Sequence, residues 1–402
     1  MIYIDGGVCA PKGFLASGIS CGIRKSNKKD LALIVSQKKA AAAGVYTKNL
    51  VKGAPIIVTQ KNIADGYARA IIVNSGNANT CNANGIEIAE GMCRLVESFT
   101  DVNSSDVIVA STGVIGQKLS LEPIERGMPS LVEGLGDNSI DAATAIMTTD
   151  TAIKEVALEF CLGGKQVRIG AIAKGSGMIH PDMATMLVFV TTDAAISPEM
   201  LQKALTDTIQ DTFNMISIDR DTSTNDTMVV LANGMAENAC IVSEGEDFEV
   251  FKAALTEISL KLSRLVAKDG EGATKLLECT VSGAKSKEDA KKIAKSVICS
   301  TLLKCAMFGS DANWGRVLCA IGYSGAQVDV NKVAVSFKSE AGEVSVCSNG
   351  GGIDFSEEKA KEVLSCGEII IDVSLGDGEA CATAFGCDLT YDYVKINGDY
   401  RS

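Results

Sequence analysis

The stretch AKGSGMIHPDMATML, residues 173–187, carries the most information about the fold and the chemistry of this chain. A β-rich run, 167–173, ends where the stretch begins, and a second run, 185–192, starts near its end. Between the two lies a polar, glycine-rich loop with a cation, Lys174, and a threonine at its exit, Thr185. A surface loop that joins two strands explains this pattern, and so does a junction at which the chain cuts itself.

Self-cleavage between Ala184 and Thr185 would turn the threonine into an N-terminal residue. Its α-amine, with an ordinary pKa of about 7.7–8.0, then serves as the base for its own hydroxyl. Such a nucleophile needs no histidine, and the sequence has only one, His180. A Ser-His-Asp or Cys-His arrangement would have to use His180, and a site with several histidines around a metal is excluded. The residues alone allow the junction without deciding for it.

The composition is that of a globular protein with a sizeable core. The 402 residues predict roughly two to three domains, and 46% of them are hydrophobic against 22% charged. The formal net charge is −12, from 38 Lys and Arg against 50 Asp and Glu. This balance argues against nucleic acid or an anionic membrane surface as the partner.

The N-terminus has no basic segment followed by an apolar run, and no apolar run approaches the length of a membrane span. Fourteen cysteines occur singly, without any C-x-x-C pair. We therefore expect free thiols in a reducing compartment, a cytoplasmic location, and neither a zinc knuckle nor a thioredoxin motif.

Short β-rich runs alternate with helical periodicity along the whole chain. The runs predict strands at 68–74, 107–111, 167–173, 185–192, 332–337, 343–347, 368–375, 380–385 and 391–397. Helices are expected from Ser197 to about 215, from 251 to 268, from Ser286 to about 307, and briefly after Ser356. The pattern indicates an α/β fold of layered sheets and helices with a strand-rich C-terminal lobe and a boundary near 185–197.

Other glycine-rich or acidic stretches fit no ligand motif. KGSGM (174–178) lacks the Walker spacing, and GDGEAC (376–381) lacks a third glycine for a dinucleotide loop. DRDTSTN (219–225) lacks the glycine of a calcium loop, and Val230 stands where that loop needs a glutamate.

Taken together, the motifs resemble those of the ornithine acetyltransferase, or glutamate N-acetyltransferase, family of arginine biosynthesis. KGSGMIHPDMATML is long and specific, and the resemblance extends over nearly the whole chain. The accompanying motifs, in the same order, are AGVYTKN (43–49), NSGNAN (74–79), STGVIG (111–116), MTTDT (147–151), DTSTNDT (221–227), SDANWGR (310–316) and INGDYRS (396–402).

The resemblance implies an α/β sandwich like those of N-terminal-nucleophile proteins and a precursor that cleaves itself between Ala184 and Thr185. Residues 1–184 would form an α chain and residues 185–402 a β chain, assembled as an α2β2 heterotetramer. Thr185 would take the acetyl group of N2-acetyl-L-ornithine and pass it to L-glutamate in a ping-pong cycle. The resemblance implies no cofactor and no metal, and it leaves open whether acetyl-CoA is a second acetyl donor.

The family pattern also assigns the site. Thr112 and Gly113 would form the oxyanion hole. The substrate contacts would come from Thr151, Lys174, Thr185, Glu271, Asn397 and Ser402. A cation such as Lys174 suits an α-carboxylate and a carboxylate such as Glu271 suits the δ-ammonium of ornithine, although the sequence does not decide which group pairs with which.

Two positions depart from the family pattern. Asp182 stands where Asn is more common, and Arg220 stands where Gly is usual. An Arg220 with positive φ would carry a strain of ~1 kcal/mol or more, and the charge of Asp182 would raise the pKa of the α-amine. Two alternative functions stay open, an N-terminal-nucleophile amidase or aminopeptidase and a non-catalytic amino-acid-binding protein.

Overall fold

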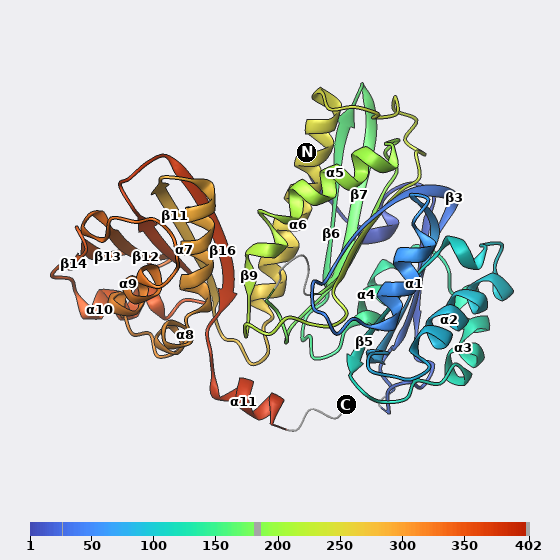
Figure 1. Cartoon of the computed structure of the whole chain (residues 1–402), viewed down its shortest axis with the longest axis horizontal. Helices are drawn as coiled ribbons and strands as arrows, with labels where there is room; N and C mark the ends of the chain where they lie inside the picture. The colour runs from blue at the N-terminus through green and yellow to red at the C-terminus, as the bar shows by residue number, and fades with distance from the viewer. Residues whose placement is uncertain (26, 181–185, 399–402) are drawn as a thin grey trace.

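The protein folds into two lobes on either side of a long helix. A computed structural model describes residues 1–25, 27–180 and 186–398. In Figure 1 the larger lobe holds the N-terminal two thirds of the colour range, and the smaller lobe holds most of the rest. Helix α6 (Glu246–Lys268) lies at the side of the larger lobe that faces the smaller one.

The larger lobe is built on a sheet whose described part has nine strands, in the order β1-β6-β7-β8-β10-β3-β4-β5 with β2 paired to β3. Their bounds are β1 (Ile2–Ile4), β2 (Phe14–Ile19), β3 (Leu31–Tyr46), β4 (Tyr67–Asn77), β5 (Val107–Val114), β6 (Lys154–Leu162), β7 (Lys165–Lys174), β8 (Leu187–Thr192) and β10 (Thr227–Ala232).

Strand β8 lies in the middle of this sheet, parallel to β10 and antiparallel to β7. Every residue of β8 and β10 is buried, because apolar clusters cover both faces of these strands, and this explains why LVFVTT and TMVVLA are nearly continuous in apolar and β-branched residues. Leu187 pairs with Lys174 on one side and with Thr227 on the other. Both ends of the loop that follows Lys174 therefore lie at one edge of the sheet.

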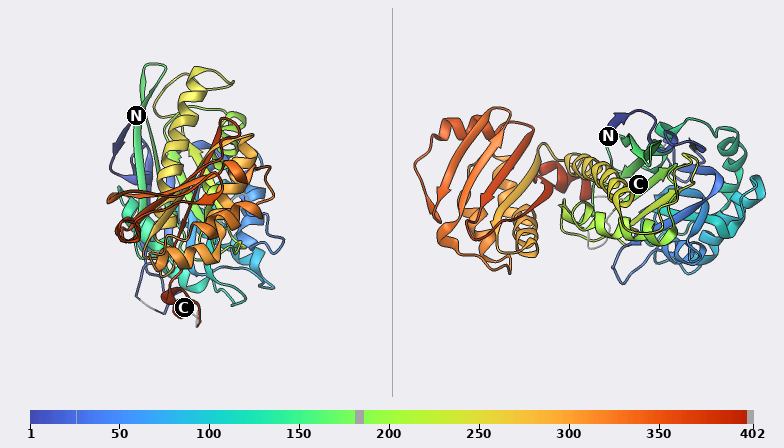
Figure 2. Two further views of the ribbon diagram at one scale, coloured as in Figure 1. Left: turned by 90° about the vertical axis from the view of Figure 1, so that its left-hand side faces the viewer. Right: turned by 90° about the horizontal axis from the view of Figure 1, so that it is seen from above.

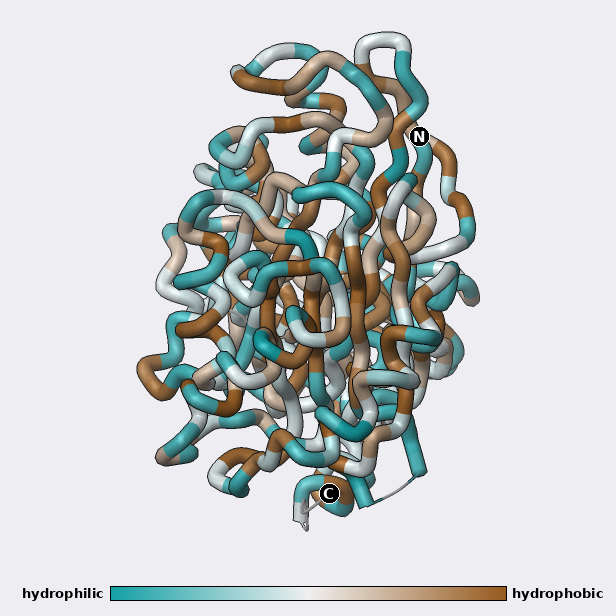
Figure 3. Tube along the Cα trace, turned by 90° about the vertical axis from the view of Figure 1, so that its right-hand side faces the viewer, coloured by the Kyte–Doolittle hydropathy of each residue, from teal (hydrophilic) through white to brown (hydrophobic). Residues whose placement is uncertain are grey.

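Helices pack on both faces of this sheet, and three clusters of buried apolar side chains fill the space between helices and sheet. One face packs under α5 (Pro198–Ile209) and α6 at one end and under α2 (Gly85–Phe99) and α3 (Glu122–Glu133) at the other. α4 (Ser139–Ile146) covers the opposite face, and α1 (Ala54–Asn62) lies against β5 and α2. Figure 3 shows hydrophobic segments running through the interior of this lobe.

The smaller lobe has a second sheet whose described part has seven strands, in the order β14-β13-β12-β15-β11-β16-β9. They are β9 (Ile216–Ser217), β11 (Leu276–Ala284), β12 (Ala334–Ser339), β13 (Gly342–Ser348), β14 (Gly351–Gly352), β15 (Glu368–Ser374) and β16 (Ala380–Cys387). The helices are α7 (Lys287–Cys299), α8 (Thr301–Phe308), α9 (Trp314–Gly322) and α10 (Glu357–Leu364), with a core of their own. Figure 2 shows this lobe standing beside the larger one, with α6 between them.

The last helix, α11 (Tyr391–Asn397), leaves the second sheet. The chain reaches it from β16, and in Figure 1 it lies below the gap between the two lobes. The Thr390 side chain caps it by accepting a hydrogen bond from the Asp392 N–H. A helix here brings residue 397 back toward the end of α6.

The α/β class and the strand-rich C-terminal lobe are confirmed, and three element predictions are wrong. The expected strand at 391–397 is helix α11, because a threonine cap favours a turn and no described strand pairs with this segment. The single helix expected over 286–307 is two, since Ser300 ends α7 and caps α8. The helix from Ser197 ends at Ile209, before the short 3-10 turn Phe213–Met215.

The expected boundary near 185–197 does not separate the two lobes. Strands β8 and β10 lie beyond it in the sequence yet pair with β7 and β3 in the middle of the larger sheet. Apart from the short strand β9, the described strands of the second sheet all follow α6. All fourteen cysteines are free thiols, as expected, and no helix within the described residues is long and apolar enough to cross a membrane.

Candidate active site

Five of the predicted site residues line one cavity of about 110 Å³. Strand β5 contributes Thr112 and Gly113, the end of β7 contributes Lys174, and the segments after α6 and in α11 contribute Glu271 and Asn397. The rest of the lining is Thr148, Thr149, Gly177, Met178 and Ser223. Residues almost 300 positions apart in the sequence therefore meet in one place.

Thr112 and Gly113 form the rim contributed by the parallel pair β4–β5. Gly113 has a φ of 130°, and a Cβ atom there would lie 2.3 Å from the backbone carbon of Gly76. Only glycine fits this close approach. The Thr112 hydroxyl is almost buried and lies 3.4 Å from the Lys174 ammonium, which donates to it.

Lys174 is a buried cation at the wall of the cavity. Burial lowers the pKa of its ammonium, and the neighbouring Lys154 lowers it further, while Asp150, Asp226 and Glu271 oppose this effect. A lysine with a depressed pKa and a free face toward a cavity can hold a carboxylate or pass a proton.

The charge of this region rests on an ion cluster under the cavity. Lys154 is 1% exposed and lies 2.6 Å from Asp150 Oδ1 and 2.5 Å from Asp269 Oδ2. Asp150 Oδ1 also accepts the Gly175 N–H at 2.8 Å. Burial alone would raise the pKa of Asp150, but Lys174, Lys154 and the hydrogen bonds it accepts together lower it to about 2. The cluster fixes the loop 148–152 against the start of the KGSG loop.

Thr151 does not line the cavity. It is exposed, and its N–H and hydroxyl both donate to the Asp269 carboxylate. Thr148 and Thr149 of the same MTTDT motif take the position at the cavity wall. The expected substrate contact from Thr151 stays a prediction, and in this structure its contact is with the ion cluster.

Glu271 and Asn397 are hydrogen-bonded to each other at the wall of the cavity. The Asn397 side-chain amide donates to Glu271 Oε2 at 2.7 Å, and the Glu271 N–H donates to the Ser176 carbonyl at 2.9 Å. A Cβ atom on Gly177 would lie 2.3 Å from the Glu271 carboxyl carbon. The glycine-rich loop is thus packed directly on this carboxylate.

The segment 219–222 holds the same loop from outside. Asp219 accepts the N–H groups of Met178 and Ile179 at 2.6 and 2.9 Å, and the Thr222 hydroxyl donates to the His180 carbonyl at 2.8 Å. Arg220, between them, has a φ of 72°, so the expected backbone strain is confirmed.

A network of amides supports the rim. The Asn225 side-chain amide donates to the Ala78 carbonyl at 2.6 Å and to the Ser111 carbonyl at 2.9 Å, and Asn225 Oδ1 accepts the Thr80 hydroxyl at 2.6 Å. The NSGNAN and STGVIG motifs are therefore held to DTSTNDT, which explains why these three motifs occur together.

A smaller cavity of about 20 Å³ adjoins the first and shares Thr112 and Lys174 with it. Met186 and Leu187, the first described residues after the junction, line it together with Asp226. The predicted residues Ala184, Thr185 and Ser402, and the departure at Asp182, lie outside the described residues.

Four charged residues near the site were missed by the sequence analysis. Asp150 and Asp226 belong to the motifs MTTDT and DTSTNDT, so a signal existed for them. Lys154 and Asp269 stand in no motif, and only the folded arrangement brings them beside Asp150. No cluster of three His, Cys, Asp or Glu side chains suited to a metal occurs in the described part of the chain.

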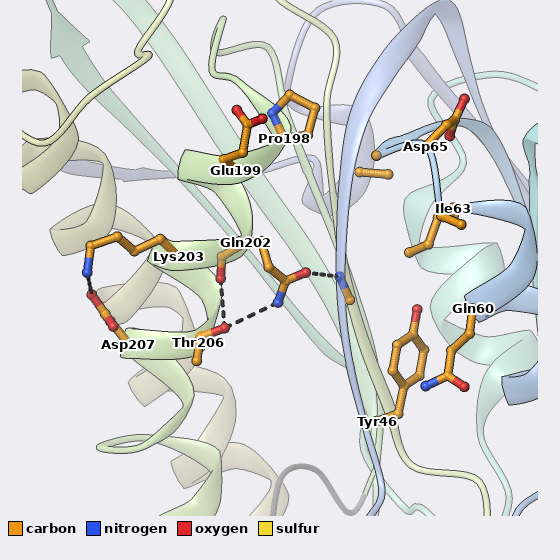
Figure 4. A pocket seen from close by; sticks show the side chains of 14 residues that line it. Tyr46, Gln60, Ile63, Asp65, Pro198, Glu199, Gln202, Lys203, Thr206 and Asp207 are labelled. Atoms are coloured by element: carbon orange, nitrogen blue, oxygen red, sulfur yellow. Dashed lines mark hydrogen bonds and ion pairs between the residues drawn. The ribbon is translucent and has the colours of Figure 1, made fainter.

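A larger groove lies elsewhere in the described part of the chain. It measures about 820 Å³ between β3, the end of α1 and helix α5, and Figure 4 shows Tyr46, Gln202 and Lys203 among its lining residues. It contains none of the predicted site residues. The volume of a cavity therefore does not identify the candidate site. The meeting of the buried charged residues Lys174 and Glu271 in the smaller cavity does.

Comparison with known proteins gives a consistent result. The sequence model of the ArgJ family matches residues 15–402. The arginine biosynthesis bifunctional protein ArgJ of Caldanaerobacter subterraneus subsp. tengcongensis is 51% identical over 404 residues, covering 100% of both chains. The protein of that name from Bacillus subtilis is 47% identical over 404 residues, covering 100% of this chain and 98% of the relative.

Among solved structures, the crystal structure of arginine biosynthesis bifunctional protein argJ from Bacillus halodurans aligns with a TM-score of 0.50 and 44% identity. The alignment covers 52% of this chain and 97% of that one. The solved chain therefore corresponds to about half of this one.

Replacing Arg220 with glycine should stabilise the protein. Glycine adopts positive φ without strain, so the free energy of unfolding should rise by up to ~1 kcal/mol, after allowance for the greater flexibility of glycine in the unfolded chain. Urea unfolding measures the change. Arg220→Ala is the control because it removes the side chain and keeps the strain, and an equal gain in both variants would contradict the assignment.

Asp150→Asn should change how stability depends on pH. The folded pKa of about 2 lies below the ordinary value, so the carboxylate stabilises the fold above about pH 4, and this contribution is lost as the pH falls through 2. The difference in unfolding free energy between wild type and variant should shrink by about 2 kcal/mol between about pH 6 and pH 2. A difference that stays constant over this range would show that Asp150 is not held ionised.

Proposed function

The chain belongs to the ArgJ family and is an acetyltransferase of arginine biosynthesis, and we propose that the cavity around Lys174 is its active site. The reaction moves the acetyl group of N2-acetyl-L-ornithine to L-glutamate. The observation that supports the site is the meeting of Thr112, Gly113, Lys174, Glu271 and Asn397 in one cavity beside the KGSG loop. The amidase and amino-acid-binding alternatives are set aside because the family accounts for the whole chain.

Thr185 is the proposed nucleophile, freed by cleavage after Ala184. Met186, the residue that follows Thr185 in the sequence, lines the smaller cavity with Thr112 and Lys174, and this supports the assignment. The free α-amine then accepts the proton of the hydroxyl as the hydroxyl attacks the acetyl carbon. The correspondence of the solved Bacillus halodurans chain to half of this one supports a division into residues 1–184 and 185–402.

Thr112 and Gly113 are proposed to stabilise the negative charge that develops on the acetyl oxygen. A hydroxyl and a backbone N–H already fixed in the fold do this without reorganisation during the reaction. The positive φ of Gly113 and the amide network around Asn225 hold this rim in place. Lys174, which donates to the Thr112 hydroxyl, adds a positive charge on the same side.

Substrate recognition uses the two opposite charges of the cavity. Ornithine and glutamate both carry an α-carboxylate, and Lys174 is the buried cation that can pair with it. Glu271, with Asn397 beside it, can accept an ammonium group of ornithine. Thr151 and Ser402 complete the proposed set of contacts.

The remaining features are also proposals. Two α and two β chains would assemble into an α2β2 heterotetramer, and the fourteen free thiols suit the cytoplasm. The word bifunctional in the names of the relatives supports acetyl-CoA as a second acetyl donor for glutamate. No cofactor is required by this scheme.

Thr185→Ala tests the proposed function. Without the hydroxyl the precursor should remain one chain of 41.9 kDa and should transfer no acetyl group from N-acetylornithine to glutamate. Thr185→Ser keeps a hydroxyl and should still cleave, more slowly or less completely. Intact mass and a glutamate-dependent assay measure both, and a Thr185→Ala protein with full acetyl transfer would contradict the nucleophile assignment.

Lys174→Ala should mainly weaken substrate binding. Loss of a charge-assisted contact costs about 1.5–3 kcal/mol, so kcat/KM for N-acetylornithine should fall roughly 10- to 100-fold, chiefly through KM. The measurement is steady-state kinetics on the cleaved fraction of the variant. An unchanged KM would remove Lys174 from the substrate contacts.

A further inference from the structure

Asp226 is a buried carboxyl group that the acetyl-transfer scheme does not use. It is 2% exposed, and its Oδ2 atom makes no hydrogen bond in the part of the chain that the structure describes. It lines the small cavity with Thr112, Lys174 and Met186. A buried acceptor without a partner is costly to the fold, so its retention needs an explanation.

The backbone places Asp226 close to Met186, the first described residue after the junction. The Thr227 N–H donates to the Met186 carbonyl at 2.8 Å, and Thr227 pairs with Leu187 in the parallel ladder. Asp226 therefore immediately precedes the first residue of β10, and Met186 immediately precedes the first residue of β8, the strand that pairs with it. Asp226 lines the small cavity together with Met186 and Leu187, the first described residues after the junction.

The self-cleavage step requires a base that the later acetyl transfer does not. Before the chain is cut, the nitrogen of Thr185 is part of a peptide bond and cannot accept a proton. His180 lines neither cavity, and its Nδ1 lies 3.0 Å from Ser217 Oγ and 3.6 Å from Cys299 Sγ. Among the side chains that line the small cavity, the titratable ones are Lys174 and Asp226.

We propose that Asp226 carries the proton during self-cleavage, a role that rests on the proposed function of Thr185. The carboxylate takes the proton from the Thr185 hydroxyl as the oxygen bonds to the carbonyl carbon of Ala184. It returns that proton to the Thr185 nitrogen as the C–N bond breaks, which leaves an ester between the two residues. One water molecule then hydrolyses the ester to the Ala184 carboxylate and a free N-terminal threonine.

The electrostatics of Asp226 suit a base. Burial raises its pKa well above the ordinary value, and the nearby Ser223 hydroxyl and Lys174 ammonium only partly oppose this. Asp150 and Glu271 also face Lys174 electrostatically, and their negative charges raise the pKa of its ammonium. A carboxylate with a raised pKa is a stronger base, so it takes a proton from a hydroxyl group more readily than an ordinary carboxylate does.

The test follows scission of newly made full-length protein over time on denaturing gels. Asp226→Asn should slow scission by ~10²-fold or more, the usual effect of removing a general base. Scission of the wild type should also speed up with rising pH through one ionisation that the variant lacks. The control is Asp193→Asn, a buried carboxyl with a raised pKa at the other end of β8, held by the Lys12 and Arg168 N–H groups, which should cleave at the normal rate.

Folding is checked separately in a chain that cannot be cut. The melting temperatures of Thr185→Ala and of Thr185→Ala with Asp226→Asn should agree closely. If the second change lowers the melting temperature, Asp226→Glu decides instead, because it keeps a carboxyl group and should cleave faster than Asp226→Asn. Equal rates for Glu and Asn would overturn the proposal.

Scission of Asp226→Asn at the wild-type rate would also overturn the proposal. In that case a Lys174→Met variant that fails to cleave would assign the proton to Lys174. Neither result touches the nucleophile, since Thr185→Ala tests that assignment independently.

Discussion

The site depends on the pairing of Lys154 with Asp150 and Asp269. Three charges are withdrawn from water here, and their desolvation is offset only because the contacts are short and the carboxylates accept further N–H groups. The cluster ties the loop before β6, the end of α6 and the loop after β7 to one another. Removing Lys154 alone would take the paired cation from Asp269 and would leave the charge of Lys174 alone to oppose that of Asp150.

The second constraint is the pairing of β8 with both β7 and β10. It brings the two ends of the junction loop to one edge of the sheet, where Asp219 and Thr222 hold the loop as far as residue 180. In this account, scission would not separate the two resulting chains, because β7 before the junction and β8 after it pair with each other in the same sheet. The proposed function combines two features of this edge of the sheet, a rim of fixed donors at Thr112 and Gly113 and a nucleophile that scission would provide with a free amine.

Local sequence patterns predicted most of the fold. Strands β4, β5, β7 and β8 are apolar runs, and the apolar residues of α6 recur at helical spacing. The order of residues within each of these segments is therefore enough to predict that it is buried. The segment 391–397 was misjudged because its alternation of aromatic and polar residues fits a strand, and only the lack of a pairing partner and the Thr390 cap make it a helix. Thr112, Gly113, Lys174, Glu271 and Asn397 were predicted through motifs. Lys154 and Asp269 were not, because a buried ion pair between distant segments leaves no local pattern.

The central claim is that the hydroxyl oxygen of residue 185 carries the acetyl group between the two substrates. The direct measurement is mass spectrometry of purified protein incubated with N-acetylornithine, without glutamate, and then quenched and digested. The account predicts one added acetyl group on the peptide that begins Thr-Met-Leu, and its loss when glutamate is supplied. An acetyl group on any other residue, or the absence of a chain with this new N-terminus from active protein, would contradict it.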